Sequence, residues 1–192
     1  MKKINYFIST FWTLSLLLSV NLSAQPKSDV PDEVNKKTIV APEDTKDKVF
    51  TLRYYDMKDS YPALTDVPPL YAASSNDKAK FVERYYIIKA AYPGLTDVYA
   101  YFASAASTLD EFTKKYYEIR DVYPVMSKYY GQYAASKHAL PEFMKRLNAI
   151  KASAPDLADC YGEFAASENT LPEFSARYYG IKYSNPQMKD AF

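Results

Sequence analysis

Tyrosines and basic residues recur in this sequence in a pattern suited to molecular recognition. Four tyrosines share one position in a 31-residue register, and a basic residue stands three positions after each of them. Aromatic rings with a polar hydroxyl are common in protein and sugar recognition surfaces, and a row of cations can bind acidic peptides, anionic glycans or phosphates. The candidate partner-binding residues are therefore Tyr55, Tyr86, Tyr117, Tyr179, Lys89, Arg120 and Lys151.

Both rows also have a structural explanation. Asn148 takes the tyrosine position in the fourth repeat, which indicates that this position contacts water on at least one side. The rings could nevertheless serve only to seal the joints between repeats. The cations fall in the last turn of an expected helix, where they complement the helix dipole. The sequence leaves open whether the rows bind a partner or stabilise the fold.

Residues for catalysis or metal binding are few. Cys160 is the only cysteine, and Val67, Val98 and Tyr129 share its register position, which favours a buried thiol. His138 is the only histidine and is expected to be exposed in a turn, without the neighbours that a metal site or a catalytic triad requires. With four glycines in the chain, no phosphate-binding loop is expected. We therefore expect no catalytic residues, no metal and no cofactor.

The 31-residue register extends through most of the chain. One position always holds phenylalanine (Phe50, Phe81, Phe112, Phe143, Phe174), another holds proline (Pro62, Pro93, Pro124, Pro155, Pro186), and a third holds a cation (Arg53, Arg84, Lys115, Arg146, Arg177). A period of this length without insertions is typical of a supersecondary unit that stacks on copies of itself.

The pattern within each unit predicts two helices. Thr108 and Glu111 form a capping box, and an apolar stripe follows it up to Tyr123, which precedes a proline; this predicts a helix over 109–122. Equivalent helices should begin near residues 47, 78, 140 and 171. A second helix is predicted over 95–106, and a fifth copy of it should begin near Met188.

The cations of the third position have acidic neighbours one helical turn earlier. Glu111 with Lys115, Glu142 with Arg146, and Glu173 with Arg177 are i,i+4 pairs in the favourable order. This spacing predicts that these cations belong to the solvated surface of the long helices.

Two helices joined by short loops form an antiparallel hairpin. We therefore predict an all-α fold, a right-handed-type α-solenoid of about four and a half 31-residue antiparallel helix-hairpin repeats. The unit resembles tetratricopeptide-type arrays in being a helix hairpin with a proline in each repeat. It departs from them in length, in its paired tyrosines and in lacking their Trp-Leu-Gly opening.

The first residues are typical of an export signal. Lys2 and Lys3 precede an apolar run over about 7–22, and Ala24 ends a small-residue cleavage site. A membrane anchor is the alternative, but polar residues dilute the run. The expected parts are a signal peptide (1–24), a flexible linker (25–45) and a helical repeat domain (46–192), with a periplasmic or secreted location and no membrane span after cleavage.

Charge and motifs together limit the function. Without the two lysines of the signal, the chain has one more acidic than basic residue, so it has no overall field for nucleic acid. The prediction is a non-catalytic protein or peptide interaction module. The alternative is a carbohydrate or cell-envelope binding protein that uses the tyrosine row, possible partners then including an anionic glycan. An enzyme on a helical scaffold is the third hypothesis.

Overall fold

The computed structural model describes residues 42–186 and residue 188. These residues all belong to one compact unit. The expected signal peptide and most of the expected linker lie outside the described residues, as does most of the expected fifth short helix.

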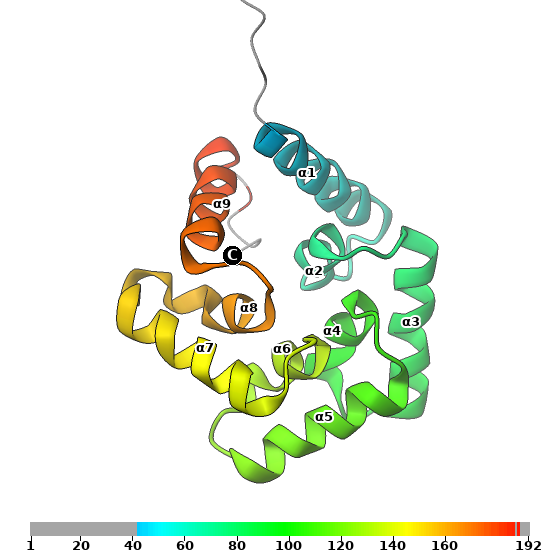
Figure 1. Ribbon diagram of the computed structural model, residues 1–192. Coiled ribbons are helices and arrows are strands. Elements are labelled where there is room, and N and C mark those ends of the chain that lie inside the picture. The colour runs from blue at the N-terminus through cyan, green and yellow to red at the C-terminus, as the bar shows by residue number, and fades with distance from the viewer. Residues whose placement is uncertain (1–41, 187, 189–192) are drawn as a thin grey trace, which may run out of the picture. The chain divides into compact units, whose positions relative to one another are not determined.

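The described part of the chain is all-α and contains no strand. Long and short helices alternate along it, and Figure 1 shows the short helices of this unit on the inside of the long ones. The long helices are α1 (Pro42–Ser60), α3 (Lys78–Ala91), α5 (Leu109–Val122), α7 (Leu140–Ser153) and α9 (Leu171–Ser184). The short helices are α2 (Val67–Ala73), α4 (Tyr99–Ser104), α6 (Tyr130–Ala135) and α8 (Tyr161–Ala166).

The long helices begin and end where their capping residues predict. Thr108 Oγ1 accepts a hydrogen bond from Glu111 N, and Glu111 Oε2 accepts one from Thr108 N (2.8 Å), which confirms the capping box. The Thr108 hydrogen bonds lower the pKa of Glu111. Asp77 caps α3 in the same position. Only α1 begins earlier than the repeat predicts, at Pro42 rather than near residue 47.

The prediction of one continuous helix over 95–106 was wrong. Residues Thr96–Val98 form a 3-10 turn, and α4 begins only at Tyr99. The reason is a side-chain hydrogen bond. The Tyr99 hydroxyl donates to Pro93 O (2.7 Å) and so fixes the turn that precedes α4. Tyr130 and Tyr161 make the same bond to Pro124 and Pro155.

Apolar contacts run from each short helix to its neighbours. Phe81, Phe112 and Phe143 are fully buried, and each packs edge-on against an aromatic ring of the preceding short helix, as Phe102 does on Phe112 at 5.3 Å. Successive short helices contact one another (Figure 1), and α1 also contacts α9. A cluster that includes Phe50 and Ile181 lies at this last contact.

In α1, α3, α5 and α7, the cation of the third register position ties the long helix to the short helix that follows it. The Arg84 Nη2 group donates hydrogen bonds to Phe102 O (3.0 Å) and Ser107 O (2.7 Å), and its guanidinium lies 4.0 Å from the centre of the Phe102 ring. We call this arrangement the cation clamp. Arg53, Lys115 and Arg146 form it with Tyr71, Tyr133 and Phe164.

The clamp corrects the interpretation of these cations as solvated surface. Lys115 donates to Ser136 O (2.6 Å) and His138 O (2.8 Å), and burial lowers its pKa. The Glu111 carboxylate accepts the capping hydrogen bond from Thr108 N. Glu142 forms an ion pair with Lys145 instead of Arg146. The cations are therefore part of the hairpin, where the carbonyl end of a short helix attracts positive charge.

A second set of hydrogen bonds links one hairpin to the next. The buried Asn76 side chain donates from Nδ2 to Ala103 O (2.8 Å) and Ala105 O (3.2 Å). His138 has the same register position, and its Nε2 lies 2.7 Å from Ser167 O. His138 is therefore half-buried and hydrogen-bonded, which corrects the expectation of an exposed histidine.

The clamp predicts different costs for two arginines. Arg84→Ala should lower the free energy of unfolding by about 2–4 kcal/mol, because it removes charged hydrogen bonds and a cation–π contact. Arg120→Ala should cost under about 1 kcal/mol, because Arg120 is exposed and its contacts with Asp121 and the Tyr117 ring lie at the surface. Urea denaturation of both variants measures this. Equal small losses would show that the clamp does not stabilise the fold.

Candidate binding site

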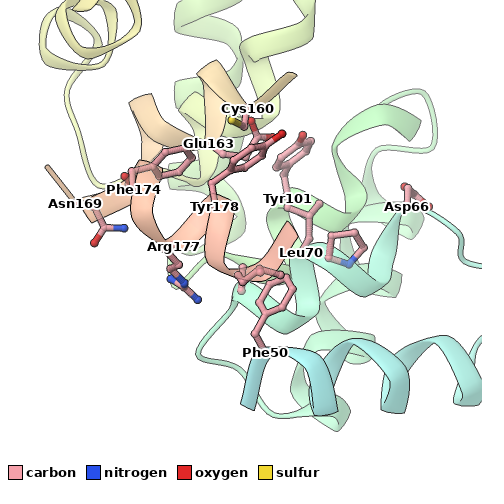
Figure 2. Close-up of a pocket in the computed structure, with 14 residues that line it drawn as sticks. Phe50, Asp66, Leu70, Tyr101, Cys160, Glu163, Asn169, Phe174, Arg177 and Tyr178 are labelled. Carbon is pink, nitrogen blue, oxygen red and sulfur yellow. The ribbon is translucent and has the colours of Figure 1, made fainter. Parts of the chain in front are cut away.

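A cavity of about 460 Å³ lies between α8 and α9 on one side and α1 and α2 on the other (Figure 2). Its apolar wall includes Phe50 of α1, Leu70 of α2, and Phe174, Tyr178 and Ile181 of α9. Glu163, Asn169 and Arg177 are among its polar residues. A concave site with an apolar lining and a few polar groups is the usual form of a ligand pocket.

Three hydrogen-bonded polar side chains, one on each of α4, α6 and α8, form a row that borders this pocket. Tyr101, Gln132 and Glu163 share one register position, and Gln132 Nε2 donates hydrogen bonds to Tyr101 Oη (2.8 Å) and Glu163 Oε1 (3.2 Å). Glycine makes this row possible, because a Cβ on Gly131 would lie 2.2 Å from the Tyr101 ring and one on Gly162 would lie 2.9 Å from Gln132. Tyr101 and Gln132 thus each pack on a glycine of the next short helix.

Glu163 ends the row at the pocket. Its Oε2 is buried and has no hydrogen-bond partner among the described residues. Burial raises the pKa of Glu163, and the hydrogen bond from Gln132 partly opposes this effect. Glu163 can therefore accept a hydrogen bond from a ligand or, when protonated, donate one.

Cys160 also lines the pocket, but its thiol is suited to packing. It is 3% exposed and its Sγ lies 3.4 Å from Leu157 O. Burial raises the pKa of Cys160 to about 12, so the thiolate required of a nucleophile is disfavoured at neutral pH. This confirms the expectation of a buried thiol.

Arg177 has the register position of the clamp cations but does not form a clamp in the described part of the chain. The structure gives it no hydrogen bond there. Its Nε is buried without a partner, as are the Nε atoms of the clamped Arg53 and Arg146. The neighbouring phenylalanine differs as well: Phe174 is only half-buried, whereas Phe81, Phe112 and Phe143 are fully buried. Arg177 and Phe174 both lie in the wall of the pocket.

The tyrosine row has varied surroundings. Tyr86 is 51% exposed, whereas Tyr55 packs against the cluster at the α1–α9 contact. The Tyr179 hydroxyl donates a hydrogen bond to the Asp156 carboxylate, which places this ring at a joint between two hairpins. Tyr117 is half-buried and packs edge-on against Tyr116 at 5.3 Å.

The three candidate cations are exposed, and each lies over a tyrosine ring. Lys89 Nζ is 5.7 Å from the centre of the Tyr86 ring, and the Arg120 guanidinium is 4.4 Å from that of Tyr117. Lys151 lies over Tyr129 at 5.1 Å, since Asn148 stands at the tyrosine position of its own helix. The structure therefore places Lys89 beside Tyr86, and Arg120 beside Tyr117.

Sequence patterns did not indicate the pocket. Glu163 and Asn169 were not among the candidates, and Arg177 was interpreted as half of a surface pair with Glu173. The signal that could have found Arg177 is its register position: a clamp joins a cation to the residues 18 and 23 positions later, as Arg146 joins Phe164 and Asn169.

The described residues contain no group of three or more histidine, cysteine or acidic side chains placed to hold a metal ion. In the same part of the chain, no helix combines the length and the apolar character needed to span a membrane. No protein-family model, curated protein or solved structure gives a match to the sequence.

Glu163→Gln should stabilise the protein in a pH-dependent way. Because the folded-state pKa of Glu163 lies above its unfolded-state value, its contribution to stability is fully present below the unfolded pKa and is lost as pH rises through the folded pKa. The melting temperature of the variant should match that of the wild type near pH 4 and exceed it increasingly toward neutral pH. A difference that does not depend on pH would contradict the raised pKa.

Proposed function

We propose that the protein is a non-catalytic binding protein that takes a peptide, or a segment of another protein, into the pocket between α8–α9 and α1–α2. We further propose that its hairpins form a right-handed, tetratricopeptide-like α-solenoid. Such arrays present extended surfaces and carry no chemistry of their own, which agrees with the small number of reactive groups in this chain.

The observation that carries this proposal is the combination of unpartnered polar atoms and aromatic walls in one pocket. Glu163 Oε2 is buried without a hydrogen-bond partner among the described residues, and Arg177 makes none of the clamp hydrogen bonds there. Buried polar groups are costly unless a partner satisfies them. Phe174 and Tyr178 offer apolar surface beside them. An acceptor and a donor on apolar walls suit a peptide, which supplies N–H, C=O and side-chain groups together.

The proposal also includes export of the protein from the cytoplasm. Residues 1–24 are proposed to be a cleaved signal peptide and residues 25 to about 41 a linker to α1, which would place the pocket outside the cytoplasm, in a periplasm or in the medium. The partner would then be a protein or peptide of that compartment.

A carbohydrate or envelope ligand on the tyrosine row is the second candidate function. The half-exposed Tyr86, with Lys89 over its ring, favours it, because such a ring can stack on a sugar while the cation binds an anionic group. This site would lie on α3, away from the residues that line the pocket.

A pocket-filling variant separates the two functions. Ala73 is an exposed residue in the pocket wall, so Ala73→Trp should block the pocket and abolish capture of a protein partner from cell-envelope extract, with the melting temperature nearly unchanged. Ala152→Trp is the matched control, because Ala152 is exposed on α7 and does not line the pocket.

Tyr86→Ala provides the opposite test. If capture survives in Ala73→Trp but is lost in Tyr86→Ala, the tyrosine row is the binding site and the pocket proposal is wrong. A glycan array probed with the same two variants shows whether the ligand of the row is a carbohydrate.

A further inference from the structure

We propose that α9 carries a second binding surface, a pair of stacked tyrosines that binds a sugar ring of a neutral polysaccharide. The two tyrosines are Tyr179 and Tyr183, which lie about one helical turn apart on the same face of α9. We call this pair the tyrosine platform. Neither residue is among those that line the pocket, so the inference goes beyond the proposed function and does not depend on it.

The platform presents a flat aromatic face to solvent. The rings of Tyr179 and Tyr183 are stacked, with their centres 5.8 Å apart and their planes at 16° to each other. Tyr183 is 76% exposed, compared with 51% for Tyr86. One face of the Tyr183 ring therefore covers Tyr179, and the other is open to a ligand.

The repeat does not account for this arrangement, because two of its residues have no equivalent in the other hairpins. The register position of Tyr183 is not aromatic in the preceding long helices, which carry Asp59, Ala90, Asp121 and Ala152 there. The register position of Asp156 is not acidic in the preceding turns, which carry Ala63, Gly94 and Val125. Asp156 accepts a hydrogen bond from the Tyr179 hydroxyl, and Tyr183 stacks on the Tyr179 ring. Two departures from the repeat thus meet at one tyrosine, which favours a binding role over a packing role.

The platform is held in place by its neighbours before any ligand binds. The hydrogen bond to Asp156 fixes the hydroxyl end of Tyr179. The buried Tyr178 packs edge-on against the Tyr179 ring, with the ring centres 5.2 Å apart. A tyrosine surface that is already ordered loses little conformational entropy on binding.

Polar groups beside the platform indicate that its ligand is a sugar. Asp156 is exposed, and one of its carboxylate oxygens forms no hydrogen bond with the described residues, so it can accept one from a ligand. Lys182 is exposed next to Tyr183; its ammonium group donates one hydrogen bond to Tyr178 Oη (3.3 Å) and has two further N–H groups.

A sugar ring matches both kinds of group. Its face carries C–H groups that can pack on the Tyr183 ring, and its edge carries hydroxyl groups that can donate to Asp156 and accept from Lys182. An aromatic side chain of a protein would cover the ring but would leave the carboxylate and the ammonium group without partners. The geometry therefore favours a carbohydrate over a protein at this surface.

The test is an NMR titration of the isotope-labelled protein with cellohexaose, maltohexaose and chitohexaose. We expect saturable binding of at least one of them, with the largest shift changes at Tyr179 and Tyr183. Tyr183→Ala should weaken this binding about fivefold or more, the factor that an aromatic contact typically contributes. The melting temperature should stay nearly unchanged, because Tyr183 is exposed. Tyr183→Phe keeps the ring and should bind nearly as the wild type does.

Two further variants complete the experiment. Tyr86→Ala is the matched control, because Tyr86 is also an exposed tyrosine of a long helix but has only an edge-on contact with Tyr85. It should bind the oligosaccharide as the wild type does. Asp156→Ala removes the hydrogen-bond acceptor and the support of Tyr179, and should weaken binding.

The outcomes separate this inference from the proposed function. Absence of saturable binding, or equal binding by Tyr183→Ala and the wild type, would overturn the tyrosine platform. Loss of oligosaccharide binding in Tyr86→Ala but not in Tyr183→Ala would assign the sugar to α3, and loss in Ala73→Trp would assign it to the pocket; either result also overturns the platform. Capture of a protein partner by the pocket is measured independently, so either proposal can fail while the other stands.

Discussion

The interaction on which the fold depends is the contact between a cation and the carbonyl end of a short helix. A helix of six residues is far too short to be stable alone, and its last carbonyl groups have no partners within the helix. Arg84 and its equivalents satisfy these carbonyls and at the same time cover an aromatic ring of that helix. Burial lowers the pKa of Arg84 and Lys115, because their charges are partly removed from water at this contact. The helix dipole and the charged hydrogen bonds offset that cost.

The abundance of tyrosine follows largely from this hairpin. At the clamped ring, tyrosine and phenylalanine alternate, so only the aromatic face is needed there. At Tyr99, Tyr130 and Tyr161 the hydroxyl itself is used, because it holds a proline carbonyl six residues earlier and closes the turn between the helices. Tyr86 differs from these rings in being half-exposed. A tyrosine count alone therefore says little about binding, and the surroundings of each ring decide its role.

Local sequence signals predicted what local interactions determine. The capping box at Thr108 and the proline after Tyr123 set the ends of α5, and the phenylalanine register identified Phe112 as core. The clamp could not be found in this way. Its acceptors are backbone carbonyls, which every residue has, and the glutamates four positions before Lys115 and Arg146 offered an equally plausible local partner. The 3-10 turns before the short helices were missed because the Tyr99 hydroxyl bond fixes them from a distance of six residues. The pocket requires contacts between α1–α2 and α8–α9, which no local pattern encodes.

The two walls of the pocket differ because successive repeats carry different side chains at one register position. Leu70 stands on α2 where the later short helices carry Tyr101, Gln132 and Glu163, so the polar row starts with an apolar residue and ends with a carboxyl group. The contact between α1 and α9 brings these two ends of the row into one cavity. A ligand there meets Leu70 and Phe50 on one side and Glu163 and Arg177 on the other. A uniformly apolar or uniformly charged molecule would leave one of these walls unmatched. The imperfect symmetry of the repeat thus makes the two walls of the pocket chemically different.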